Sequence, residues 1–200
     1  MVQQKQSVVT PERFSKGLTY AQYLDAIERN RARFEENYAG TEIPADLVAR
    51  LKALVARPDG PKKLMVLGED WCPDVFRGMP VFARIAEAAG LELRVFMRDQ
   101  HKDIMAEYMN AGEFESIPVA VFYSQDFEEL AQWIERPALA TQQMHELAPM
   151  YARLRKADKT PEEAAAAKQE YIDFQNGPVW GGWRIETVRE CLDRLEAKLS

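Results

Sequence analysis

The sequence predicts an α/β fold, with a central region of strands and helices and a helical extension at each end. Two observations lead to this prediction. Between residues 62 and 134 the hydrophobic pattern changes in the order strand, helix, strand, helix, strand, strand. On both sides of that region, apolar residues recur with helical spacing. A chain of 200 residues can bury a substantial core without a metal or a disulfide.

The first part of the chain, residues 1–59, is predicted to be a helical extension. Residues 1–18 are polar and are expected to be loosely ordered. Leu18–Tyr38 and Pro44–Ala56 each carry apolar residues near helical spacing, so each is predicted to form one helix. The helix-breaking sequence R-P-D-G-P at Arg57–Pro61 marks the boundary that follows.

The central region, residues 60–136, contains the predicted strands. Lys62–Gly68 is a short apolar run bounded by turn residues, which is typical of a strand buried on both faces. A helix is predicted after Cys72, with Gly90 as its C-terminal cap. The elements predicted next are a strand at Leu91–Met97, a helix from Lys102 to Ala111, and a hairpin of Val119–Tyr123 with Glu128–Ile134.

The last part, residues 137–200, is predicted to be helical and to pack on the core, so that the chain forms one compact domain. One helix is expected from Ala138 to Lys156, with a kink at Pro149, and another begins at the capping Thr160. The glycine-rich segment Asn176–Trp183 is predicted to be a loop before the final helix. The two tryptophans of this loop, Trp180 and Trp183, are expected to pack the C-terminal helices onto the core.

Composition and charge exclude several classes of protein. The chain is 46% hydrophobic and 29% charged, which is typical of a globular protein. Its formal net charge is -6, and the basic residues form no stripe, so we expect neither nucleic acid nor a membrane as a partner. The sequence shows no signal-peptide pattern and no apolar run long enough to span a membrane, and the expected compartment is the cytoplasm.

The cysteines and histidines indicate neither a metal site nor a cofactor. Cys72 and Cys191 lie far apart, and so do His101 and His145, which is not the spacing of metal ligands. Cys191 lies at the edge of the apolar stripe of the last helix and is expected to pack in the core. Any cysteine chemistry therefore begins from the single thiol of Cys72.

The predicted location of Cys72 favours a reactive thiol. A strand that ends before it and a helix that begins after it place the sulfur at a helix N-terminus, where a thiolate is stabilised. Trp71 and Pro73 would flank the sulfur. Three nearby acids would oppose its ionisation: Glu69, Asp70 and Asp74. The sequence does not fix the direction of the net pKa shift.

The segment W-C-P-D-V, Trp71–Val75, resembles the W-C-x-x-C motif of the thioredoxin superfamily, with Val75 in place of the second cysteine. Pro80 stands where that family has a proline inside the helix, and Pro118 stands where it has a cis-proline facing the thiol. The resemblance covers about residues 60–136. It implies a thioredoxin-like fold, with a central mixed four-stranded sheet flanked by helices.

The resemblance also implies a site, with Cys72 as the catalytic residue. The substrate-binding residues it implies are Trp71, Pro73, Asp74, Ile117 and Pro118. In the family, the first cysteine attacks a substrate disulfide and the second cysteine resolves the mixed disulfide that forms. Both departures from the family pattern affect this second, resolving step. Val75 replaces the resolving cysteine, and Val66 stands where the family often has a buried aspartate.

Two functional hypotheses follow. In the first, the protein is a monothiol oxidoreductase, whose mixed disulfide with a protein or a small thiol is resolved by an external thiol. This hypothesis predicts a Cys72 pKa below that of a free thiol. In the second, the protein is a catalytically silent binding module that uses the groove beside Pro118. A weaker third possibility is a peroxidase-like role, with Cys72 oxidised to a sulfenic acid.

Overall fold

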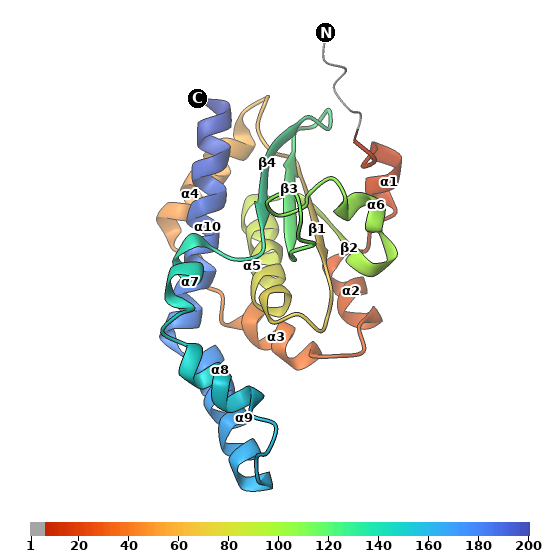
Figure 1. Ribbon diagram of the computed structural model, residues 1–200. Coiled ribbons are helices and arrows are strands. Elements are labelled where there is room, and N and C mark those ends of the chain that lie inside the picture. The colour runs from red at the N-terminus through yellow and green to blue at the C-terminus, as the bar shows by residue number, and fades with distance from the viewer. Residues whose placement is uncertain (1–6) are drawn as a thin grey trace.

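The computed structural model describes residues 7–200 and contains a four-stranded sheet between helices (Figure 1). Its elements are α1 (Pro11–Ser15), α2 (Tyr20–Ala26), α3 (Arg31–Ala39), α4 (Ala45–Ala56), β1 (Lys63–Gly68), α5 (Pro73–Ala89), β2 (Glu92–Met97), the 3-10 helix η1 (Arg98–Gln100), α6 (Lys102–Met105), β3 (Val119–Tyr123), β4 (Glu129–Ile134), α7 (Ala138–Gln143), α8 (Ala148–Arg155), α9 (Pro161–Asn176) and α10 (Pro178–Leu199).

The sheet is mixed, as predicted. Its strand order is β2-β1-β3-β4, with β1 parallel to β2 and antiparallel to β3, and β3 antiparallel to β4. Every residue of β1 is buried, which explains why this strand is a continuous apolar run instead of an alternating one. Helix α5 begins shortly after the C-terminal end of this central strand.

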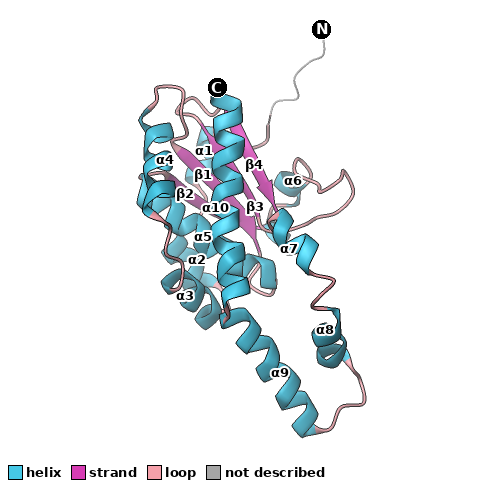
Figure 2. Ribbon diagram, turned by 90° about the vertical axis from the view of Figure 1, so that its left-hand side faces the viewer, coloured by secondary structure: helices cyan, strands magenta, loops and turns pink. Residues whose placement is uncertain are grey.

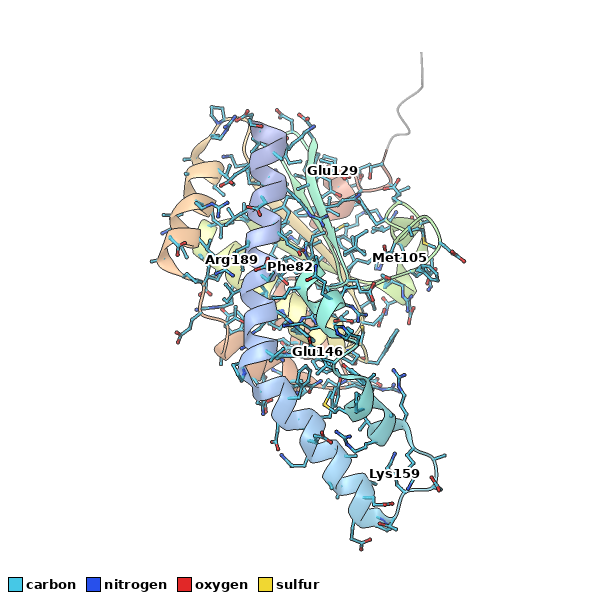
Figure 3. All side chains as sticks on the ribbon, turned by 60° about the vertical axis from the view of Figure 1, so that its left-hand side comes forward. Phe82, Met105, Glu129, Glu146, Lys159 and Arg189 are labelled. Atoms are coloured by element: carbon cyan, nitrogen blue, oxygen red, sulfur yellow. The ribbon has the colours of Figure 1, made fainter. Side chains whose placement is uncertain are left out.

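Helices cover both faces of the sheet. Helices α3, α4, α5 and α10 lie on one side, and α1, α2 and α6 lie on the other (Figure 1). The last helix, α10, contacts α4, α5 and β4 and so packs along the sheet layer (Figure 2). Helices α8 and α9 pair with each other and extend away from the body, with Lys159 near the far end of this arm (Figure 3).

The predictions for α4 and α5 are confirmed. Helix α5 begins at Pro73 and ends at Ala89, and Gly90 caps it in the left-handed conformation with φ of 77°. Pro80 lies inside this helix. The predicted cap at Thr160 is also present, because its side chain accepts a hydrogen bond from the Glu163 N–H at the start of α9.

The predictions for the N-terminal part are partly wrong. Within residues 1–18, Thr10 caps the short helix α1, so this segment is more ordered than expected, while residues 1–6 lie outside the described part of the chain. The single helix predicted at Leu18–Tyr38 is two helices, because the chain breaks at Ile27–Asn30. At this break, Asp70 accepts hydrogen bonds from backbone N–H groups, a long-range contact that no local pattern reveals.

Two further predicted helices are shorter than expected. Helix α6 ends at Met105 instead of Ala111, which has a positive φ of 52° in the turn that follows. The helix predicted over Ala138–Lys156 is interrupted between α7 and α8. Pro149 lies in the first turn of α8, where proline is tolerated. It therefore marks the start of a helix instead of a kink within one.

The predicted loop at Asn176–Trp183 is wrong for most of its length. Gly177 caps α10, and the helix runs through both tryptophans. Trp180 and Trp183 are each only 1% exposed, so tertiary packing outweighs the helix-breaking tendency of the glycines between them. The predicted packing role of these tryptophans is confirmed, and so is the burial of Cys191.

No helix within residues 7–200 has both the length and the apolar character needed to cross a membrane.

We expect Gly68→Ala to lower the free energy of unfolding by about 1–3 kcal/mol, because overpacking forces a close-packed core apart. A Cβ atom at position 68 would lie 2.7 Å from Val75 Cγ1 and 2.9 Å from Met79 Cε. Urea denaturation measures the change. The matched control is Gly182→Ala in α10, whose added Cβ meets nothing within 4 Å and which should stabilise the helix by about 1 kcal/mol. Equal stabilities for the two variants would contradict the tight contact between β1 and α5.

Candidate functional site

Cys72 lies at the end of the connection between β1 and α5, and it is the N-cap residue of that helix. Its carbonyl oxygen accepts hydrogen bonds from the Val75 and Phe76 N–H groups at 3.0 and 3.1 Å, which start the helix. The thiol is half-buried, and its Sγ lies 3.8 Å from the Ile117 carbonyl oxygen. The sulfur therefore lies between a helix N-terminus and the loop that precedes β3.

The second wall of the site is the loop that carries Pro118. The Ile117–Pro118 peptide bond is cis. Helix α5 approaches this proline closely at Gly78, where an added Cβ would lie 3.1 Å from Pro118 Cγ. The loop is held from the other side by Glu135, whose N–H donates to the Pro118 carbonyl oxygen at 2.8 Å. The proline loop is thus held between α5 and the residue that follows β4.

The position of the family's second cysteine is filled by a core side chain. Val75 has no exposed surface and packs against Gly68 at the end of β1. Val66, at the position of the family's buried aspartate, is equally buried and pairs with Val95 and Ala120 in the sheet. Cys191, the other thiol, is enclosed in the core on α10, where burial raises its pKa. Within residues 7–200, no second thiol is accessible to Cys72.

The pKa of the Cys72 thiol is raised above its ordinary value. Burial is the main cause, because it disfavours the charged thiolate. The backbone N–H of Val75 near the sulfur opposes this effect, and the negative charge of Asp74 adds to it. The helix N-terminus therefore does not outweigh desolvation. This direction differs from the lowered pKa that the monothiol hypothesis predicts, so that part of the prediction is not borne out.

Two arginines pair with Asp74 next to the thiol. Arg77 Nη1 donates to Asp74 Oδ1 at 2.7 Å, and Arg136 Nη2 lies 2.9 Å from the other carboxylate oxygen. Asp74 is mostly buried, so this pairing offsets the cost of removing its charge from water. The pairing also weakens the field of Asp74 at the sulfur, since Arg77 acts to lower the pKa of Cys72.

Arg77 connects the site to the C-terminal helix. It is 1% exposed, and its guanidinium lies 5.3 Å from the ring of Trp180 and 5.6 Å from that of Trp183. Its Nη2 also donates to the Glu135 carbonyl oxygen at 3.3 Å. Sequence reasoning missed this residue. The available signal was an arginine within the otherwise apolar run Val75–Phe82.

The structure brings only part of the predicted site together. Cys72, Asp74, Ile117 and Pro118 lie around the sulfur. Pro73 is the exposed first residue of α5. Trp71 is 44% exposed, with the Arg98 guanidinium 5.4 Å from its ring centre, and it lines a separate cavity.

A family model described as thioredoxin matches residues 17–155, more than half of the chain. The chain belongs to the thioredoxin family. This confirms the resemblance inferred from W-C-P-D-V and the two prolines. The matched range begins before and ends after residues 60–136, so the family model also covers the helices next to the motif-bearing region.

Two solved structures are similar over nearly the whole chain. A protein of unknown function from Pseudomonas aeruginosa is 17% identical, with 94% of this chain and 98% of that chain covered and a TM-score of 0.63. An HIV epitope-scaffold is 18% identical, with 96% and 99% covered and a TM-score of 0.60. At these identities the likeness shows the thioredoxin-like fold alone. Among curated proteins, none matches the chain significantly.

The raised pKa predicts slow alkylation of Cys72 by iodoacetamide near neutral pH, because only the thiolate reacts. A free thiol has a pKa of about 8.5 and reaches half its maximal rate near that pH. We expect the midpoint for Cys72 to lie at higher pH, as measured by mass spectrometry of the native protein. The Cys72→Ser variant is the control and should not label, because Cys191 is fully buried. A midpoint below about 8 would overturn the assignment of burial as the dominant effect.

Proposed function

We propose that the protein performs thiol-disulfide exchange through Cys72 alone, with an external thiol completing the reaction. The observation that carries this proposal is the placement of the half-buried Cys72 sulfur at the start of α5, 3.8 Å from the Ile117 carbonyl oxygen and beside cis-Pro118. A partner disulfide at this site would meet one accessible sulfur, since Val75 fills the position of a second.

The proposed reaction has two exchanges. The Cys72 thiolate attacks one sulfur of a partner disulfide, a bond forms between the two sulfurs, and the other partner sulfur leaves as a thiolate that takes a proton from water. An external thiolate then attacks the partner sulfur bound to Cys72. Cys72 is released as a thiolate, and the external thiol becomes part of the new disulfide. The sequence of steps leaves Cys72 unchanged and moves the disulfide between external groups.

The raised pKa of Cys72 shapes the expected kinetics. Little thiolate is present at neutral pH, so the first step depends on holding the partner in the groove more than on ionisation. A thiol of high pKa is also a poor leaving group, so release of Cys72 in the second step is slow. We therefore expect a long-lived mixed disulfide and slow turnover.

A comparison of the wild type with Val75→Cys tests the proposal. The substrate is a glutathionylated peptide, and the reductants are glutathione and dithiothreitol. We expect wild-type activity that depends on the external thiol and falls to the background rate in Cys72→Ser. The Val75→Cys variant should accelerate release of the partner from Cys72, because its new thiol attacks the Cys72 sulfur, expels the partner as a thiolate and forms an intramolecular disulfide, which the external thiol then reduces.

The matched control is Val75→Ala, which empties the same core position without adding a thiol. It separates the effect of a resolving sulfur from that of a loosened helix start. Activity in Val75→Cys together with an inactive wild type would reject the monothiol mechanism and identify a silenced exchange site.

A second candidate, a binding module without turnover, is favoured by two observations. The pKa of the thiol is raised, which disfavours catalysis. Within residues 7–200, the Ile117 N–H beside Pro118 makes no hydrogen bond, which leaves one unpaired backbone donor next to the thiol for an extended peptide that adds along this edge. In this second candidate, the Cys72 side chain forms part of the binding surface but does not react.

Peptide binding to Cys72→Ser distinguishes the two candidates. A binding module keeps its affinity for a disulfide-containing peptide within about twofold, because a hydroxyl and a thiol occupy similar space. The exchange mechanism predicts that the same variant loses covalent capture of the peptide, as detected on a non-reducing gel. Isothermal titration calorimetry supplies the affinity, and a Pro118→Ala variant, which alters the groove itself, should weaken binding in either case.

A further inference from the structure

A cavity of about 320 Å³ lies at the carboxyl ends of the parallel strands β1 and β2. One wall is Glu69–Trp71, which follows β1, and a second is formed by Met97, Asp99 and Gln100 at the end of β2. The third wall is formed by Tyr23 and by Ala26–Arg29, at the end of α2 and in the break before α3. Crevices outside the carboxyl ends of strands are the common ligand sites of α/β sheets. The volume is at the lower end of the range for small-molecule pockets.

The charged groups that line this cavity are mostly acidic. Four carboxylates face a single basic residue, Arg29: those of Glu28, Glu69, Asp70 and Asp99. Asp99 is paired with Arg98 and Lys102, at 2.8 and 3.3 Å. Within residues 7–200, Glu69 and Asp70 form no ion pair, so acidic groups outnumber basic ones at the cavity wall.

The carboxylates of Glu69 and Asp70 are held in place by backbone groups. Glu69 Oε1 accepts from the Asp99 N–H at 2.7 Å, and Asp70 Oδ2 accepts from the Glu28 and Arg29 N–H groups at 3.0 and 2.8 Å. In the described part of the chain, the second oxygen of each carboxylate makes no hydrogen bond. Both side chains are therefore oriented, and each keeps one oxygen for a ligand. Burial raises the pKa of Glu69, while the hydrogen bond from the Asp99 N–H and the charge of Arg98 act in the opposite direction.

Tyr23 is a second and independent observation. It lines the cavity and has no exposed surface, and its hydroxyl finds no hydrogen-bond partner among residues 7–200. The charges of Asp70 and Glu69 act on this hydroxyl, so it lies near the two carboxylates. Buried tyrosine hydroxyls nearly always have a partner. The partner missing here is the kind of atom that a bound ligand supplies.

We propose that this cavity is a binding site for an organic cation, an alkylammonium or guanidinium group, held by Glu69, Asp70 and the Tyr23 hydroxyl beside the indole of Trp71. No cluster of acidic, histidine or cysteine side chains within residues 7–200 is arranged to hold a metal ion, which favours a larger cation with several N–H donors. Such a group donates to the free carboxylate oxygens and to the hydroxyl, and its carbon chain packs on Trp71 and Met97. The cation is carried by a lysine or arginine side chain of a bound peptide or by a free amine.

The site adjoins Cys72 through Trp71 but does not depend on the chemistry of the thiol. The test therefore uses the full-length protein with Cys72→Ser, so that its failure and a failure of thiol exchange are distinguishable. Two probes are titrated while amide and indole chemical shifts are recorded by NMR: cadaverine, and a short peptide with one lysine. Their neutral counterparts are 1-pentanol and the same peptide with glutamine.

We expect saturable shifts at the Trp71 indole and at Ala26–Arg29 for the cationic probes alone. Saturation by cadaverine indicates that a free amine suffices, and saturation by the lysine peptide alone indicates a side chain of a bound peptide. Glu69→Gln keeps an acceptor for the Asp99 N–H and should weaken binding about tenfold. Tyr23→Phe should also weaken binding, without loss of stability, because the hydroxyl makes no bond in the free protein.

The matched control is Glu113→Gln, which removes one exposed negative charge outside the cavity and should leave binding unchanged. The proposal is overturned if neither cationic probe produces saturable shifts at these residues. It is equally overturned if the neutral probes bind as well, or if Glu69→Gln and Tyr23→Phe bind as tightly as Glu113→Gln does.

Discussion

The buried charge of Arg77 is the constraint on which the arrangement of the site depends. A guanidinium taken out of water costs several kcal/mol unless it is paired and hydrogen-bonded. Here Asp74, the Glu135 carbonyl oxygen and the rings of two tryptophans from α10 surround it. The first turn of α5, the loop after β4 and the C-terminal helix are therefore held together by one side chain. Cys72 is positioned as a consequence, because it caps that same turn.

The chemistry open to Cys72 follows from what surrounds it. Its sulfur has the helix N-terminus and the cis-proline loop of a thioredoxin-family site. Burial nevertheless raises its pKa, and a core valine occupies the place of a resolving thiol. This combination favours binding and slow exchange over rapid catalysis. An oxidoreductase of the usual kind would need both a lower pKa and a second accessible sulfur.

The end of α2 and the segment before α3 line the acidic cavity in addition to covering the sheet. Asp70 follows β1, and it interrupts the segment between α2 and α3 by accepting hydrogen bonds from the N–H groups of Glu28 and Arg29. The same carboxylate lines the acidic cavity beside Trp71. The break in the helix and the proposed cation site thus have one physical origin. A partner that reaches Cys72 past Trp71 would meet this negative surface.

Local patterns in the sequence determined the sheet, the buried strand β1, the helix α5 with its Gly90 cap, and the thioredoxin motif. Each of these depends on residues close together in the chain, where hydrophobic period and capping preferences act directly. The break at Ile27–Asn30, the helix through Trp180 and Trp183, and the direction of the Cys72 pKa were decided by the tertiary structure. The first depends on Asp70, the second on burial of two indoles, and the third on desolvation of the sulfur. Sequence alone could not decide them, because hydrogen bonds and burial between distant segments override local propensity.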